Sequence, residues 1–166
     1  MDSPTIATRN GNARALLFRD ATRADLPAIV RLLWDDETAR HREDPSEPLD
    51  PRYIAAFEAI HADLNQRLVA AELDGRIVGT MQLSFLPGLS FRGSWRGLIE
   101  AVRIASDLRG QRLGEAMILW AVEQCRARDC KLVQLTSTAT RTAAHRFYAR
   151  LGFVQSHVGM KLHLRD

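Results

Sequence analysis

The chain has 166 residues, of which 46% are apolar and 26% are charged, and these shares are ordinary for one globular domain. Its net charge of +3 is small and no run of Lys or Arg is present, which disfavours nucleic acid as a partner. No stretch of about 18 apolar residues occurs, so we expect no membrane span and no membrane partner.

The N-terminus is polar and carries no apolar signal core, which disfavours secretion and favours a cytoplasmic protein. We expect residues 1–13 to be a flexible N-terminal segment and residues 14–166 to form a single domain. Cys125 and Cys130 fall at or near the end of one predicted helix, on different faces, so we expect reduced thiols and no internal disulfide. The Cys and His residues show no zinc-ligand spacing, so we expect no metal.

The first part of the chain is predicted to form one strand and two helices. Residues 16–19 read as a strand, and apolar residues recur at helical spacing over residues 25–36, with Pro27 in the first turn. A second helix is predicted over residues 50–64. The segment between the helices is loop-like and contains seven carboxylates: Asp35, Asp36, Glu37, Glu43, Asp44, Glu47 and Asp50. The ordinary interpretation of such a run is a solvated loop.

The rest of the chain alternates strands and helices. Residues 67–73 and 76–85 are predicted strands joined by an Asp-Gly hairpin turn. Residues 89–96 are predicted to be a loop or strand edge that exposes Phe91 and Trp95, against a substrate, a second subunit or solvent alone. The later elements are a strand, a helix, a strand, a helix and two strands, over residues 99–105, 110–128, 131–136, 142–151, 153–157 and 160–164.

The stretch Arg-Gly-Gln-Arg-Leu-Gly at residues 109–114 directly follows a predicted strand and opens a helix. Such a junction leaves several backbone N–H groups without partners, and the helix dipole adds roughly +0.5 charge there. Together they favour a phosphate or pyrophosphate. The stretch is neither a Walker loop nor a dinucleotide fingerprint. The alternative interpretation is an ordinary strand–turn–helix whose glycines serve the turn.

Residues 109–114 resemble motif A of the GCN5-related N-acetyltransferase (GNAT) family, and residues 144–153, AHRFYARLGF, resemble the family's C-terminal motif. The two pieces stand in the family's order, and the resemblance covers roughly residues 18–164. Arg112 stands where the first motif glycine is usual, and Arg141 where an Asn often precedes the C-terminal helix. The resemblance implies an α/β (α+β) fold with a mixed, mostly antiparallel sheet of six to seven strands flanked by four helices.

The resemblance also implies acetyl-CoA as co-substrate. Its pantetheine arm would lie along the strand at residues 99–105, in a strand splay, and its pyrophosphate would lie against the loop at residues 109–115. Arg141 would reach a phosphate or only solvate its helix face. The predicted cofactor-binding residues are Val102, Ile104, Arg109, Gly110, Gln111, Arg112, Leu113, Gly114, Glu115, Arg141 and Ala144.

Two residues are predicted to carry the chemistry that the resemblance implies. An alkyl ammonium of pKa near 10.4 is only about 0.04% free base at pH 7, so a base is valuable. Glu100 is the predicted base, on one strand face with Val102 and Ile104; alternatively it pairs with a nearby arginine, Arg96 or Arg103. Tyr148 is the predicted acid for the departing thiolate; alternatively it is a packed aromatic residue.

The predicted function is acetyl-CoA-dependent transfer of an acetyl group to a primary amine, with a small molecule as the acceptor. In the resembled family the segment between the first two helices borders the acceptor site, so its carboxylates would concentrate a cationic amine. Dimers are common in that family, and exposed Phe91 and Trp95 are compatible with a homodimer. The alternative function is a non-catalytic acyl-CoA-binding regulatory or sensing module.

Overall fold

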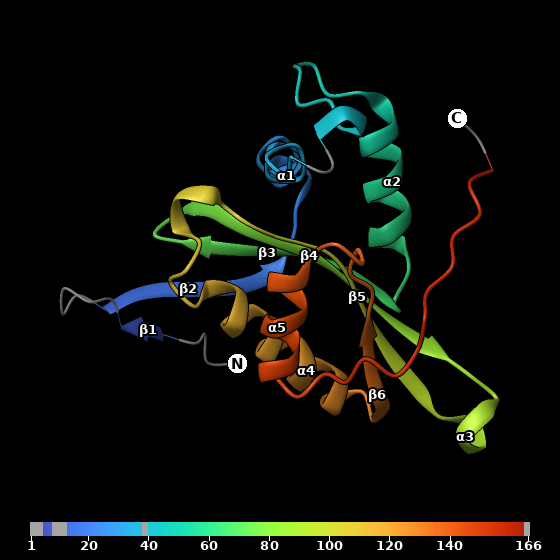
Figure 1. Ribbon diagram of the computed structural model, residues 1–166. Coiled ribbons are helices and arrows are strands. Elements are labelled where there is room, and N and C mark those ends of the chain that lie inside the picture. The colour runs from blue at the N-terminus through green and yellow to red at the C-terminus, as the bar shows by residue number, and fades with distance from the viewer. Residues whose placement is uncertain (1–4, 8–12, 38–39, 165–166) are drawn as a thin grey trace.

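The computed structural model describes residues 5–7, 13–37 and 40–164. Six strands form one sheet in the order β1-β2-β3-β4-β5-β6 (Figure 1). Four of the five strand pairings are antiparallel and the last, β5 with β6, is parallel, which confirms a mixed and mostly antiparallel sheet. The strands are β1 (Thr5–Ala7), β2 (Ala13–Asp20), β3 (Gln66–Leu73), β4 (Arg76–Pro87), β5 (Trp95–Ile104) and β6 (Cys130–Leu135).

Four main helices accompany the sheet, as predicted: α1 (Leu26–Trp34), α2 (Pro51–Ala62), α4 (Leu113–Ala127) and α5 (Thr142–Arg150). The short α3 (Ser90–Gly93) precedes β5. Figure 1 shows α1 and α2 on one face of the sheet and α4 on the other face. Phe147 of α5 packs against the core on the α4 face. No helix in the described part of the chain has the length and apolarity that crossing a bilayer requires.

The two faces of the sheet bury two separate apolar cores. The larger lies under α4 and includes Met81, Ile99 and Met117. The helix sits very close to β5 there, as Gly97 shows: a Cβ atom added to this residue would lie 2.2 Å from the Cys125 Sγ. The smaller core lies under α1 and α2; its fully buried members are Ala21, Leu26, Ile29, Phe57 and Ala70. The sheet therefore holds α1 on one side and α4 on the other in fixed positions.

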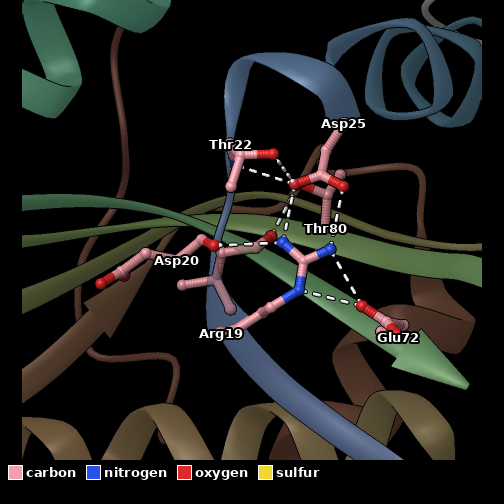
Figure 2. Close-up of polar contacts among 7 residues, drawn as sticks. Arg19, Asp20, Thr22, Asp25, Glu72 and Thr80 are labelled. Carbon is pink, nitrogen blue, oxygen red and sulfur yellow. Dashed lines mark hydrogen bonds and ion pairs between the residues drawn. The ribbon is translucent and has the colours of Figure 1, made fainter. Parts of the chain in front are cut away.

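A network around Arg19 ties the start of α1 to the sheet (Figure 2). Arg19 on β2 donates to both carboxylate oxygens of Asp25 at 2.7 and 2.9 Å, and its Nε donates to Glu72 at 2.9 Å. Asp25 also accepts from the backbone N–H and the hydroxyl of Thr22. The hydrogen bonds from Arg19 lower the pKa of Asp25 to about 2. One cation thus satisfies two carboxylates where the helix begins.

The predicted last strands, residues 153–157 and 160–164, do not form, and the sheet ends at β6 (Figure 1). Apolar side chains of this segment are 82–93% exposed instead: Val154, Val158, Met160, Leu162 and Leu164. Alternating apolar residues predict a strand with one apolar face, but a strand also needs the edge of another strand that pairs with it. The predicted N-terminal segment lies mostly outside the described residues, and its described part pairs as β1 with β2.

The two cysteines lie in different elements, so the prediction that both belong to one helix is wrong. Helix α4 ends at Ala127, and the chain turns back at Asp129, which has a φ of 54°. Cys130 therefore starts β6. Both thiols are free, as expected, and burial raises the pKa of Cys125 to about 12.

Candidate active site

Strands β5 and β6 run side by side, and β6 ends first. They pair from Trp95 to Ile99 on β5 and from Cys130 to Leu135 on β6. Strand β5 continues to Ile104, and along this continuation it pairs only with β4. Within the described residues, the outer edge of residues 100–104 has no strand partner. A strand edge beyond the end of β6 is therefore open to an extended ligand, and the splay itself stays a prediction, because β6 ends at its last paired residue, Leu135.

A β-bulge interrupts β5 in this unpaired part. Gln82 pairs with Glu100 and Thr80 pairs with Arg103, so two residues of β5 oppose one of β4. Ala101 in the bulge has a φ of 52°, a left-handed conformation that is uncommon outside glycine. A bulge changes the sheet face to which the following side chains point. The residues after Ala101 therefore cannot be assigned to a face by simple alternation along the sequence.

The bulge places Glu100 and Arg103 on the same face of the sheet, because their partners Gln82 and Thr80 are two residues apart. This face carries α1 and α2, since Ala70, the partner of Thr80 on β3, belongs to their core. Ile104 pairs with Gly79 and points to the α4 face. The prediction that Glu100 shares a face with Val102 and Ile104 is therefore wrong. Glu100 is exposed, and no described residue forms an ion pair with it.

The loop before α4 presents a row of backbone N–H groups. Gly110 and Arg112 have left-handed φ angles of 79° and 63°, which turn the chain into the helix. The first helical hydrogen bond runs from the Ala116 N–H to the Arg112 carbonyl at 3.0 Å. Within the described residues, none of the six amides from Gly110 to Glu115 donates to the protein. The start of α4 thus presents the unpartnered backbone donors that an anion-binding site needs, and anion binding there stays a prediction.

The arginines of this loop are held by carboxylates. Arg112 Nη2 lies 2.7 Å from Glu115 Oε1, and this contact lowers the pKa of Glu115. Arg109 Nη2 lies 3.8 Å from Asp35, and its Nε donates to the Ile104 carbonyl at 3.4 Å. Both side chains remain more than half exposed, so a phosphate can reach them at the solvent side of the loop.

Tyr148 lies on α5 between two aromatic rings, with centroids 5.1 Å from Phe147 and 5.8 Å from Phe153. Its hydroxyl has no hydrogen-bond partner among the described residues. Burial raises the pKa of Tyr148, and the nearby charges of Arg141 and Arg103 oppose that shift more weakly. The phenol therefore stays protonated at neutral pH and has a proton to donate.

A largely buried ionic cluster joins the end of α1, β5 and the residue before α5, and sequence patterns do not reveal it. Asp36, which follows α1, lies 3.2 Å from Arg103 Nη2 and 3.4 Å from Arg141 Nη1. The Arg103 side chain is only 14% exposed, and its Nε has no partner. The structure thus directs the Arg141 side chain towards α1 rather than towards the loop before α4. No spacing rule connects these residues, because each comes from a different element.

Most carboxylates of the acidic segment, residues 35–50, form ion pairs or hydrogen bonds within the protein. Asp35 and Asp36 pair with arginines, and Glu43 pairs with Arg42 and accepts from the Tyr53 hydroxyl. Asp44 and Asp50 accept hydrogen bonds from Ser46 and Arg52. Four of the seven carboxylates thus pair with arginines: Asp35, Asp36, Glu43 and Asp50. Within the described residues, no group of three or more His, Cys, Asp or Glu side chains has a metal-binding arrangement.

The family model described as acetyltransferase (GNAT) family matches residues 26–153. The chain is 36% identical over 142 residues to a glucosamine 6-phosphate N-acetyltransferase of Trypanosoma brucei brucei, covering 81% of this chain and 95% of that protein. It is 34% identical over 101 residues to an aminoalkylphosphonate N-acetyltransferase of Salmonella typhimurium (strain LT2), covering 61% of this chain. That match spans only 65% of the relative's length.

Among solved structures, a transcriptional regulator from Bacillus halodurans C-125 is 43% identical to this chain and superimposes with a TM-score of 0.88. The match covers 90% of this chain and 99% of that one. This chain and that structure therefore share the fold along nearly their whole length. The shared part includes the open edge of β5, the amides before α4, and Phe147 and Tyr148 of α5.

Proposed function

The chain belongs to the acetyltransferase (GNAT) family, whose members use acetyl-CoA, and on that premise we propose that it acetylates the primary amine of a small molecule by direct attack on the thioester. The observation that carries this proposal is the open edge of β5 beside six unpartnered amides. The edge suits an extended pantetheine arm, and the amides suit its diphosphate.

The proposed coenzyme site draws on two parts of the chain. The amides from Gly110 to Glu115 would hold the diphosphate, helped by the positive end of the α4 dipole and by the exposed Arg109 and Arg112. The backbone at Val102 and Ile104 would hold the pantetheine arm, and Ala144 of α5 stays a predicted contact. Arg141 no longer belongs to this set, because its guanidinium lies against Asp36.

In the proposed reaction, acetyl-CoA supplies the acetyl group as a thioester. Glu100 takes a proton from the acceptor's ammonium group, directly or through water, and the freed nitrogen forms a bond to the acetyl carbon. As the carbon–sulfur bond breaks, Tyr148 gives its proton to the departing sulfur, and the positively charged nitrogen loses its second proton, which restores the phenol. The raised pKa of Tyr148 supports this role, because a phenol that stays protonated has a proton to give.

A small acceptor is favoured over a protein acceptor by the relatives. The matched enzymes of Trypanosoma and Salmonella are named for glucosamine 6-phosphate and for aminoalkylphosphonates. Both compounds are small, and both join an amine to a phosphorus oxyanion. We therefore propose that this chain also acts on a compact amine.

The second candidate function is an acyl-CoA-sensing module that binds the coenzyme without turnover. The specific observation in its favour is the 43% identity to the transcriptional regulator from Bacillus halodurans. A sensor needs the coenzyme site but neither a base nor an acid.

The two candidates are separated by the variants E100Q and Y148F. We expect amine-dependent release of free thiol from acetyl-CoA by the wild-type protein, and a fall in kcat of about 100-fold in each variant. Calorimetry should show unchanged coenzyme affinity in both. If no member of a panel of amines stimulates thiol release while acetyl-CoA still binds, the sensing function is correct. The absence of any heat on adding acetyl-CoA would contradict both.

We further propose that the protein forms a homodimer. Phe91 is 69% exposed, and the apolar side chains of residues 154–164 lie open to solvent near the unpaired edge of β6 (Figure 1). Apolar groups and a free strand edge together favour a second copy. Light scattering should give twice the chain mass, 37 kDa against 18.7 kDa, and a monomer at all concentrations would contradict the proposal.

A further inference from the structure

We propose that Arg103 and Arg141 bind a compact oxyanion, a phosphonate, phosphate or carboxylate, on the amine acceptor itself. The two guanidiniums come from β5 and from the residue before α5, and they meet at Asp36. This inference rests on the proposed function and names its substrate class. It reverses the expectation that the acceptor side of the site attracts positive charge.

The charges of the cluster do not cancel. Arg103 and Arg141 share one oxygen of a single carboxylate, Asp36 Oδ2. The other charges that act on Arg103 are Arg42 and Glu43, which are opposite in sign and 3.6 Å apart, so they offset each other. One positive charge is therefore in excess at this place.

The excess charge is buried, where it is costly. The Arg103 side chain is 14% exposed. Its Nη1 donates to the Val102 carbonyl at 2.8 Å and its Nη2 faces Asp36, but its Nε has no partner. Burial lowers the pKa of Arg103, so its surroundings stabilise the cation less than water does. A second anion at this point would supply both the missing charge and a missing acceptor.

The cluster lies where an acceptor would pass. Arg103 belongs to the part of β5 that β6 leaves unpaired, and it shares a sheet face with Glu100. Tyr148 is close enough to both arginines for their charges to affect its pKa. Arg141 is 45% exposed, so an anion from solvent can reach it. An amine placed between Glu100 and Tyr148 would then extend its oxyanion to the two guanidiniums, whose forked donors suit such groups.

The test compares acceptors that differ only in charge. β-Alanine and β-alaninamide have the same shape, with and without a carboxylate, and 2-aminoethylphosphonate carries the phosphorus oxyanion. We expect the wild-type protein to favour an anionic acceptor over β-alaninamide by at least tenfold in kcat/KM. The comparison of phosphonate with carboxylate then identifies which oxyanion fits.

The variants R103Q and R141Q should each reduce that preference at least fivefold, through a raised KM for the anionic acceptor. R126Q is the matched control, because Arg126 also pairs with one carboxylate, Glu123, but at the far end of α4 and 69% exposed. R126Q should keep the preference. Because Arg103 is buried, thermal melting must show that R103Q is folded, and the half-exposed R141Q provides the same test independently.

A binding measurement separates this inference from the proposed function. With the coenzyme site saturated by CoA, calorimetry should detect methylphosphonate binding to the wild-type protein and a loss of it in R103Q and R141Q. Undetectable binding, or equal kcat/KM for β-alanine and β-alaninamide, would overturn the inference while acetyl transfer stands. An equal loss of kcat for charged and neutral acceptors in the variants would also overturn it, because the arginines would then act on the departing thiolate.

Discussion

Helix α1 has a buried carboxylate at each end, and the two are paired in opposite ways. Asp25 at its start is 10% exposed and shares the cation Arg19 with a second carboxylate, Glu72. Asp36 beyond its end is 9% exposed and is shared by two cations, Arg103 and Arg141. The two carboxylates are buried to nearly the same extent, but the ratio of cations to carboxylates is one to two at Asp25 and two to one at Asp36.

The difference shows in the pKa values of the two central arginines. The carboxylates around Arg19 raise its pKa. In the network of Figure 2, the Nε, Nη1 and Nη2 atoms of Arg19 all donate to Asp25 or Glu72. Burial lowers the pKa of Arg103, and its Nε remains without a partner. The network at Arg19 completes its own hydrogen bonds, whereas the cluster at Asp36 leaves one donor open, and we propose that a ligand completes it.

The largest effect on stability should come from breaking the complete network. In R19M, Asp25 and Glu72 lose their shared cation and face each other as buried or half-buried carboxylates. We expect the free energy of unfolding to fall by about 3 kcal/mol, the lower part of the range for broken buried pairs. Urea unfolding measures it. A loss below 1 kcal/mol would mean that the network of Figure 2 does not hold α1 in place.

The same network should make stability depend on pH in the acid range. The pKa of Asp25 falls from 3.8 to about 2 on folding, so the folded state favours the ionised form. Its contribution is fully present above pH 4, and is lost as the pH falls through 3.8 towards 2. It amounts to about 2 kcal/mol, since each pKa unit corresponds to about 1.36 kcal/mol. The stability gap between wild-type protein and D25N should therefore shrink below pH 4. A gap that stays constant from pH 7 to pH 2 would contradict this.

Most of the fold follows from local sequence, whereas the network at Arg19 does not, because it joins residues up to 53 positions apart. The helices and the strands from β2 to β6 lie within a few residues of their predicted bounds, because apolar periodicity and Gly or Pro mark them. The unpartnered amides at the start of α4 follow from residues 109–114, and anion binding there stays a prediction. The last two strands are predicted from the alternation of apolar and polar residues, but they do not form. Alternation shows which face of a strand would be apolar, and it does not show which strand edge would pair with it.

The incomplete cluster could not be predicted in the same way. Asp36 and Arg141 are 105 positions apart, and only the folded sheet brings them together. The bulge at Ala101 is equally hidden, because no glycine marks its positive φ. It moves Arg103 onto the face of Glu100 and places Ile104 on the opposite face. The missed residues are thus those whose position depends on tertiary contacts.

Removing the central arginine of the incomplete cluster should cost much less stability than R19M. In R103M, Asp36 keeps Arg141, and an apolar side chain replaces a buried cation that has an open donor. Exchanging buried ionic groups for apolar ones is often neutral. We expect a change in unfolding free energy within about 1 kcal/mol, measured by the same urea titration. A loss as large as that of R19M would show that both clusters serve the fold equally.

The smallest effect should come from an exposed pair, which sets the baseline for both clusters. Arg126 and Glu123 lie three positions apart on α4 and are 69% and 64% exposed, so water screens their attraction. We expect R126Q to lower the unfolding free energy by no more than about 0.5 kcal/mol, and less in 1 M salt. If R103M matches R126Q in stability but loses the preference for anionic acceptors, the buried Arg103 contributes to recognition and not to folding. If R126Q also lost that preference, overall positive charge, and not the cluster at Asp36, would explain it.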